Sequence, residues 1–276
     1  MVDTARGDSV TTEGAALSAT QPWVDPHLAP LYDLFPFEAD LPLYLELAAA
    51  QGGRVLELAC GSGRVLVPLA RAGHQVTGID VSAPMLGLTR QKLDAAGPDV
   101  AAHARLLQGD MRDFELDETF DLAVIAVKSF AYMIARADQQ RVLTAVAAHL
   151  RPGGLLALDL LHPSPAWLAE LPGSLRQDLV ARVPERGLTL ARTEAVVATD
   201  LAAQVRTIRS WYELVTDDGA VTKRYVEWPF RYVYRFEAEH LLERAGLEVE
   251  AVYGGYQREP FTSDSRVMLF LARRAE

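Results

Sequence analysis

The 276-residue sequence predicts an α/β fold built on a mostly parallel sheet, and two patterns indicate this. Between residues 53 and 162, short β-branched or leucine-rich runs alternate with longer helical patterns, which is typical of strands buried on both faces. Between residues 189 and 235, apolar and polar residues alternate, which is typical of antiparallel strands. With 50% hydrophobic residues and a mean hydropathy of +0.05, the chain can form one large core or a core with a modest second module.

The first part of the chain supplies the expected parallel sheet and its helices. Strands are expected, in order, at residues 54–58, 75–79, 104–108, 120–127 and 154–160. The helices between them are expected at residues 63–72, 82–95 and 137–150. Ser82 can cap the second helix, Pro84 fits its first turn, and Gly73 ends the first helix.

The second part of the chain is expected to add an antiparallel layer and then to complete the sheet. After Pro163 and Pro165, residues 166–179 have a weak helical pattern, and alternating runs follow at 189–199, 202–215 and 221–235. The turn Asp217-Asp218-Gly219 indicates a hairpin between the last two runs. A helix at 238–245 and strands at 247–253 and 266–272 come last. The predicted organisation is a flexible tail at 1–22, a core at 23–163 and 236–276, and a cap inserted at 164–235.

Composition and charge disfavour several classes of function. A net charge of −10 weighs against nucleic acid as a partner, because binding to phosphate backbones requires a basic face. The longest apolar runs are far shorter than the ~20 residues of a membrane span. The first residues lack the pattern of a signal peptide, and the single cysteine, Cys60, cannot form an intramolecular disulfide. We therefore expect a cytoplasmic protein with a small-molecule partner.

The turn after the first expected strand indicates a ligand site. Gly61 and Gly63 permit a tight reversal and let a ligand approach the backbone closely. A dinucleotide-binding turn would have a third glycine where this chain has Leu66, and Glu57 would repel a pyrophosphate. A nucleoside that carries an amino acid fits better, because Glu57 could order its cationic amino group directly or through water.

The next strand ends add polar groups along the same edge of the sheet. Asp80 follows the second strand, 19 residues after Gly61, where a carboxylate can accept hydrogen bonds from both ribose hydroxyls. Asp110 and Met111 follow the third strand and could contact the amine and ring of an adenine. The end of the fourth strand, residues 126–130, is expected above the reacting centre.

These residues together resemble the class I S-adenosylmethionine-dependent methyltransferases. Residues 57–63 look like the glycine motif of that family, Asp80 like its ribose-binding acid, and residues 109–111 like its adenine contact. The resemblance covers residues 30–163 and roughly the last 40. It implies a Rossmann-like, seven-stranded, mostly parallel sheet with helices on both faces and an antiparallel last strand, with S-adenosyl-L-methionine as the cofactor.

Other motifs are similar to bacterial N-methyltransferases of small molecules, such as enzymes of antibiotic biosynthesis that act on amino sugars and peptides. These motifs are Tyr32-Asp33, residues 61–64 with 68–70, and residues 227–232. Residues 127–130 depart from the Asn/Asp-Pro-Pro-Tyr/Phe motif, so DNA adenine and release-factor-type acceptors are not implied. The resemblance thus favours N-methylation of a secondary metabolite.

The expected reaction is an in-line displacement in which the acceptor attacks the methyl group of the sulfonium. Alignment of the two reactants at about 3 to 3.5 Å can supply most of the acceleration. An amine needs only to be neutral, whereas a hydroxyl profits from a general base. For O-methylation, His162 at the end of the fifth strand is the candidate base, although it can also be a turn residue before Pro163. Lys128 is expected to extend outward from the cationic sulfonium.

Two further functions stay open. One is nucleotide-dependent oxidoreduction on a similar sheet, which Leu66 and Glu57 disfavour. The other is a cofactor-binding protein that no longer methylates, or one that uses the pocket for a different reaction such as a cyclisation.

An aromatic stripe is expected on the last alternating run, at Trp228, Phe230, Tyr232, Tyr234 and Phe236. It can pack the cap on the sheet or on a second subunit of a homodimer, or it can wall a substrate pocket that Tyr32, Phe35 and Phe37 also close. The expected cofactor-binding residues are Tyr32, Glu57, Ala59, Gly61, Gly63, Arg64, Asp80, Val81, Met85, Asp110, Met111 and Val127. The expected substrate residues are Phe35, Ser129, Tyr132, His162, Trp228 and Tyr232, and no metal is required.

Overall fold

A computed structural model describes residues 9–10, 23–34 and 37–275 of the chain. The predicted flexible tail at 1–22 lies outside these residues except for Ser9–Val10. These two residues form strand β1, which pairs antiparallel with β5 (Phe114–Glu115). Within the described residues, no helix is both long and apolar enough to cross a membrane.

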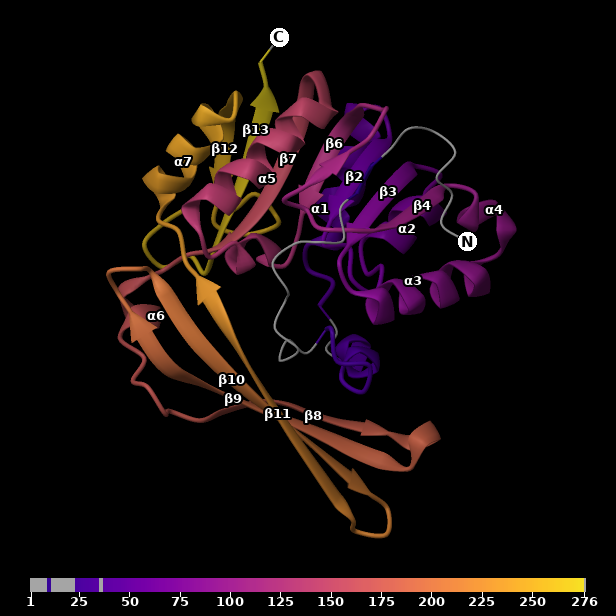
Figure 1. Cartoon of the computed structure of the whole chain (residues 1–276), viewed down its shortest axis with the longest axis vertical. Helices are drawn as coiled ribbons and strands as arrows, with labels where there is room; N and C mark the ends of the chain where they lie inside the picture. Colours follow the sequence, from indigo (N-terminus) through magenta and orange to yellow (C-terminus); the bar gives the residue numbers. More distant parts are fainter. Residues whose placement is uncertain (1–8, 11–22, 35–36, 276) are drawn as a thin grey trace.

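The core is a seven-stranded sheet in the order β12-β13-β7-β6-β2-β3-β4 (Figure 1). Strands β2, β3, β4, β6 and β7 are parallel, and β13 is antiparallel to both of its neighbours, as predicted. The bounds are β2 Arg54–Leu58, β3 Gln75–Asp80, β4 Ala104–Gln108, β6 Phe120–Ile125, β7 Leu150–Leu161, β12 Leu247–Tyr253 and β13 Val267–Arg274.

Helices cover both faces of this sheet. On one face, Leu43 of α1, Leu66 of α2 and Leu86 of α3 pack on the central strands, and on the other face Val142 of α5 and Leu241 of α7 do so. The oxygen of Ser82 accepts a hydrogen bond from the amide of Met85, which confirms the predicted cap of α3. The helices are α1 Leu41–Gln51, α2 Leu66–Arg71, α3 Ala83–Ala96, α4 Pro98–Ala101, α5 Arg136–His149 and α7 Arg235–Arg244, with 3-10 helices η1 Ala29–Leu34, η2 Ser129–Tyr132 and η3 Pro184–Arg186.

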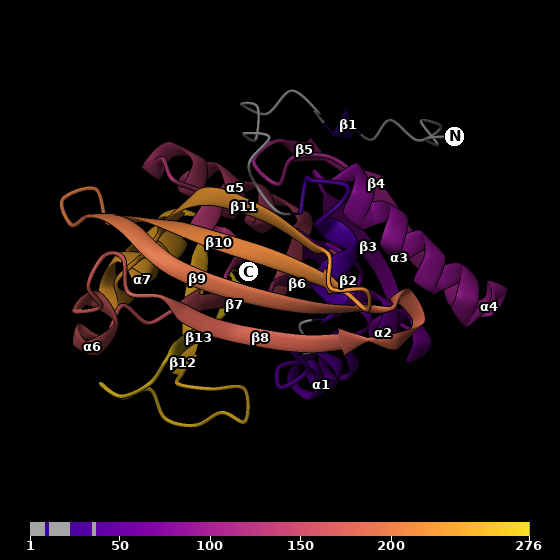
Figure 2. The ribbon, with the colours of Figure 1, turned by 90° about the horizontal axis from the view of Figure 1, so that it is seen from below.

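The cap is a four-stranded antiparallel sheet, β11-β10-β9-β8, that lies across the core near the ends of the central strands (Figure 2). The helical pattern predicted at 166–179 is wrong, because only the short helix α6 (Pro165–Leu168) forms and a fourth strand follows it. That strand, β8, is an edge strand whose residues Arg176, Gln177, Val180 and Arg182 are exposed, so it does not need the alternation of a half-buried strand. The cap strands are β8 Arg176–Val183, β9 Leu188–Asp200, β10 Val205–Thr216 and β11 Val221–Arg231.

The predicted aromatic stripe is interrupted at the end of β11. The strand stops at Arg231, and α7 begins at Arg235 with a capping box between Tyr234 and Glu237. Tyr234 and Phe236 are therefore exposed, by 46% and 68%, instead of lying on the inner face of the cap sheet.

Arg206 of β10 fixes α6 and the residues just after it to the cap sheet. Its fully buried guanidinium donates to the carbonyl oxygens of Trp167 and Glu170 at 2.7 and 2.9 Å, and it stacks 4.3 Å from the Trp167 ring. This contact holds α6 against β10.

Candidate active site

A cavity of about 430 Å³ lies between the carboxyl ends of the central strands and the cap sheet. Its lining comes from the strand-to-helix turns of the core, from η1 and η2, and from β9, β10 and β11 of the cap. Twelve of the residues expected from sequence line it, namely Tyr32, Ala59, Gly61, Asp80, Val81, Met85, Asp110, Met111, Val127, Ser129, Tyr132 and Trp228.

The two glycines of the first turn have different roles. Both have positive φ, +56° at Gly61 and +75° at Gly63, as the tight reversal requires. A Cβ added at Gly61 would meet no atom within 4 Å, so the backbone is open to the cavity there. A Cβ at Gly63 would lie 2.6 Å from Cγ2 of Thr89. Gly63 therefore permits close packing on α3 and does not line the cavity.

Asp80 presents a buried carboxylate to the cavity. It accepts hydrogen bonds from the backbone amides of Gly61 and Ser82 at 2.7 and 2.8 Å. Burial raises the pKa of Asp80 to about 6, and these two amides oppose the shift. Each oxygen keeps acceptor capacity for a hydroxyl donor.

Glu57 and Arg64 lie behind the turn, which corrects their expected place in the lining. Glu57 is only 3% exposed, and its Oε2 has no hydrogen-bond partner among the described residues. Burial raises the pKa of Glu57 to about 8, although the charge of Arg64 opposes this. Arg64 instead forms a bidentate ion pair with the fully buried Asp40, in which its two terminal nitrogens lie 2.6 and 2.7 Å from the carboxylate oxygens. It also donates a hydrogen bond to the carbonyl oxygen of Phe37.

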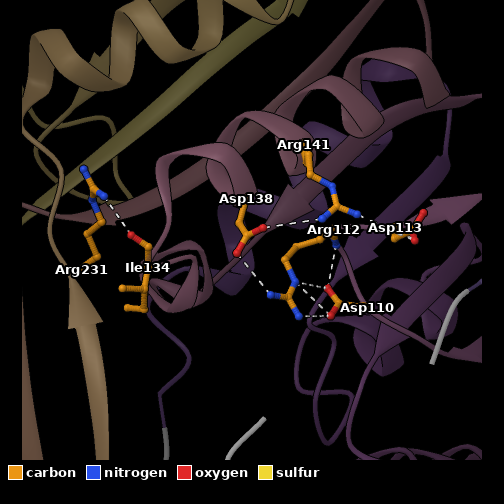
Figure 3. A network of polar contacts seen from close by, with 7 residues as sticks. All are labelled: Asp110, Arg112, Asp113, Ile134, Asp138, Arg141 and Arg231. Carbon is orange, nitrogen blue, oxygen red and sulfur yellow. Dashed lines mark hydrogen bonds and ion pairs between the residues drawn. The ribbon is translucent and has the colours of Figure 1, made fainter. Parts of the chain in front are cut away.

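The carboxylate of Asp110 is held by a guanidinium that sequence reasoning missed. Nε of Arg112 lies 2.9 Å from Oδ1 of Asp110, and Nη1 of Arg112 contacts Asp138 of α5 at 3.3 Å (Figure 3). Burial alone would raise the pKa of Asp110, but the Arg112 guanidinium holds it below the usual value. Asp138 and Arg141 continue the network, so one edge of the cavity is tied to α5.

The turn after β6 has a strained backbone. Val127 and Lys128 have φ values of +51° and +60°, which are uncommon without glycine and unfavourable for a β-branched residue. The ammonium group of Lys128 does not extend into solvent but is held by two residues that do not line the cavity. Its Nζ lies 3.7 Å from Oδ2 of Asp159 and 3.5 Å from the hydroxyl of Tyr256.

The cap side of the cavity is aromatic with two charged residues. The ring centroid of Trp23 lies 4.5 Å from that of Tyr132 and 6.1 Å from that of Trp228, and Tyr132 lies 6.3 Å from Phe230. Glu194 accepts a hydrogen bond from the hydroxyl of Ser210 at 2.5 Å. Phe230 of the expected aromatic stripe and Gly109 of the expected adenine contact also line the cavity. The lining residues not expected from sequence include Trp23, Leu28, Arg112, Met133, Arg192, Glu194, Ile208 and Tyr212.

A signal for the charged pair exists in the sequence. Arg192 and Glu194 share a face of β9 with the buried Leu190, because side chains two residues apart point the same way. Charged residues on the apolar face of an alternating run indicate a site, and this pattern could have revealed the pair.

Two of the expected substrate residues that the structure describes, His162 and Tyr232, are not part of the cavity lining. Nδ1 of His162 lies 2.7 Å from the carbonyl oxygen of Ser265, and its ring packs on Phe261 at 4.8 Å. Tyr232 packs between Trp167 and Tyr234, at 5.6 and 5.7 Å. Phe35 lies outside the described residues, and Phe37 lies between the side chains of Arg64 and Lys128 rather than in the lining.

Comparison with known proteins identifies the family. Residues 55–154 match the methyltransferase domain family. The chain is 30% identical over 229 residues to the cypemycin N-terminal methyltransferase of a Streptomyces species, covering 81% of this chain and 84% of that protein. The protein therefore belongs to the S-adenosylmethionine-dependent methyltransferases, and it is an enzyme that uses this cofactor.

Solved structures support the same fold. The CcbJ methyltransferase of Streptomyces caelestis superposes with a TM-score of 0.77 at 24% identity, covering 93% of this chain and 99% of that one. The glycopeptide N-methyltransferase MtfA, in complex with S-adenosylmethionine, has a TM-score of 0.52 at 26% identity, covering 86% of this chain and 95% of that one.

Proposed function

We propose that this enzyme methylates an amine of a small secondary metabolite. The observation that carries the proposal is the aromatic wall of the cap side, Trp23, Tyr132, Trp228 and Phe230, with the carboxylate of Glu194 beside it. Aromatic faces and a carboxylate both attract an amine in its cationic form. Of the relatives named above, one is by its name an N-terminal methyltransferase of cypemycin and another a glycopeptide N-methyltransferase.

The core side of the cavity suits the cofactor. Asp80 would accept hydrogen bonds from the ribose hydroxyls, and the open backbone at Gly61 would let the nucleoside approach closely. Asp110 and Met111 would hold the adenine, with Val81, Met85 and Val127 as apolar contacts. When bound, S-adenosylmethionine supplies a methyl group on a positively charged sulfur.

The residues of the chain act mainly by positioning. The acceptor nitrogen must be neutral to attack the methyl group, and it releases one proton to solvent after the transfer. Holding nitrogen and methyl carbon about 3 to 3.5 Å apart in line supplies most of the rate. The contacts of His162 with Ser265 and Phe261 argue against the alternative of O-methylation with this histidine as the base.

Glu194→Gln tests the amine proposal. Methyl-labelled S-adenosylmethionine is incubated with a panel of amino sugars and peptide amines and with matched alcohols that lack the nitrogen. We expect labelled amines only, and a KM for the amine about tenfold higher in the variant, with unchanged affinity for S-adenosylhomocysteine. The control is Glu213→Gln, which removes a carboxylate from the opposite face of β10, where Lys223 pairs with it. Labelling of the alcohols alone, or an unaltered KM in the Glu194 variant, would refute the proposal.

We further propose a cytoplasmic homodimer without nucleic-acid partners. The net charge of −10 supports the last point. The outer face of the cap sheet carries Trp211 and the 64% exposed Tyr225, with Arg209 stacked on both rings, and a second subunit could cover it. Sedimentation equilibrium should give twice the monomer mass of 30.2 kDa, and a monomer at all concentrations would exclude the dimer.

A further inference from the structure

A polar cluster adjoins the cavity behind the turn after β6. Its members are Lys128, Asp159 of β7 and Tyr256, which follows β12. The hydroxyl of Tyr256 donates to Oδ2 of Asp159 at 2.7 Å, and Nζ of Lys128 lies 3.7 Å from the same oxygen. Lys128 lines the cavity, whereas Asp159 and Tyr256 do not. The partners of the ammonium group are therefore residues outside the cavity lining.

The ring of Phe37 also contacts the ammonium group of Lys128. Nζ of Lys128 lies 5.6 Å from the centroid of Phe37, and Phe37 contacts the ring of Tyr256 edge-on at 5.7 Å. The carboxylate, the hydroxyl and the ring thus hold the charge together, and the side chain of Lys128 is only 25% exposed.

Asp159 is a buried carboxylate with only one of its two oxygens hydrogen-bonded among the described residues. It is fully buried, and its Oδ1 has no hydrogen-bond partner among the described residues. Burial raises the pKa of Asp159, and the charge of Lys128 and the hydroxyl of Tyr256 oppose the shift. A buried carboxylate destabilises a protein unless it is paired, so its partner Lys128 must be held in place.

The backbone supports the same arrangement. The positive φ values of Val127 and Lys128 turn the chain sharply between β6 and η2. Strain of this kind persists only where the surroundings fix it, and it gathers at functional sites. The ion pair of Lys128 with Asp159 is one contact that fixes this turn.

We propose that Asp159, aided by Tyr256, is a positioning residue that keeps the Lys128 ammonium away from the cavity, so that the cavity accepts a sulfonium. A free ammonium in the lining would repel the positively charged sulfur of S-adenosylmethionine. It would not repel S-adenosylhomocysteine in this way, because the sulfur of that product is neutral. The ratio of the two dissociation constants, donor over product, therefore measures the charge that the cavity presents to the sulfur.

Calorimetry on Asp159→Asn tests the proposal without any methyl acceptor. The ratio of donor Kd to product Kd should rise about tenfold in the variant, and it should fall back at high salt, because salt screens an exposed ammonium. Lys128→Met should lower the ratio, because it leaves a carboxylate without its cation near the sulfur. The double variant should return the ratio toward that of the natural protein. A loss of packing alone would weaken both ligands equally.

Two further variants keep the result decisive. Asp121→Asn is the matched control, because Asp121 pairs with Arg151 near the start of β6, the end of the strand away from the cavity. Its ratio should not change. If Asp159→Asn does not fold, Tyr256→Phe keeps the carboxylate and should raise the ratio about twofold. An unchanged ratio in folded Asp159→Asn would overturn the proposal. If that variant does not fold, an unchanged ratio in Tyr256→Phe would overturn it. A double variant of Asp159 and Lys128 whose ratio stays high would overturn it as well. The amine proposal would be unaffected, since no acceptor is used.

Discussion

Replacement of Glu57 by glutamine should make the enzyme more stable in alkaline solution. Glu57 is buried behind the glycine turn, and one of its oxygens has no hydrogen-bond partner among the described residues. The carboxyl group is therefore more favourable there in its neutral form, and burial raises its pKa from 4.5 to about 8. Glutamine has nearly the same shape and stays neutral at every pH.

The expected size follows from the two pKa values. A difference between 4.5 in the unfolded chain and about 8 in the folded chain corresponds to roughly 5 kcal/mol over the full range, at 1.36 kcal/mol per pH unit. Because the folded pKa is raised, the contribution is fully present below pH 4.5 and is lost as the pH rises through 8. Between pH 5.5 and 8.5, the natural protein should lose about 3 kcal/mol relative to the variant.

The assay is urea unfolding of both proteins across this pH range. The control is Glu248→Gln, which replaces an exposed glutamate of β12 and should leave the pH dependence as it is. Asp80, whose pKa is raised to about 6, contributes in both proteins, so the difference between them isolates Glu57. Parallel stability curves for the natural protein and the Glu57 variant would show that Glu57 is ionised in the folded chain and would refute the reasoning.

Two further predictions concern the same edge of the sheet. Gly63→Ala should lower the free energy of unfolding by about 1 to 3 kcal/mol, because its Cβ would lie 2.6 Å from Thr89. Gly61→Ala should lower the free energy of unfolding less, because its Cβ meets no atom, but it should weaken the binding of S-adenosylhomocysteine more than Gly63→Ala does. Chemical unfolding and calorimetry on both variants check this, and equal profiles would contradict it. Arg112→Met should let the pKa of Asp110 rise, because the guanidinium that lowers it is removed. As the pH is lowered, the variant should therefore lose its binding of S-adenosylhomocysteine at a higher pH than the natural protein does. An identical pH profile by calorimetry would contradict it.

The sheet could be predicted because parallel strands buried on both faces appear in the sequence as short, nearly continuous apolar runs. Leu56, Val76 and Val124 lie in such runs, and each is at most 2% exposed. The residues at the strand ends could be predicted for a related reason, since the carboxyl ends of parallel strands meet at one edge. The positions of Gly61 and Asp80 in the lining of the cavity follow from this rule.

The cap side could not be predicted in the same way, because its geometry depends on contacts between distant segments. The expectation for His162 rested on its position after a strand, but its hydrogen bond reaches Ser265, 103 residues later. Trp23, which precedes η1, lines the cavity beside Trp228 of β11, more than 200 residues later in the chain. Helix α1 was missed as well, although its Leu43 and Leu47 are buried.

Buried carboxyl groups near the cavity connect the stability of the chain with ligand binding. Glu57, Asp80 and Asp159 are each less than 10% exposed, and burial raises the pKa of all three. Two nearby cations, Arg64 and Lys128, are engaged by Asp40 and Asp159. Of the three carboxyl groups, Asp80 is the one that lines the cavity, and burial makes its ionised form unfavourable in the chain without ligand. We expect a sulfonium bound in the cavity to offset part of the charge of Asp80, so that a group that lowers the stability of the free chain favours the methyl donor.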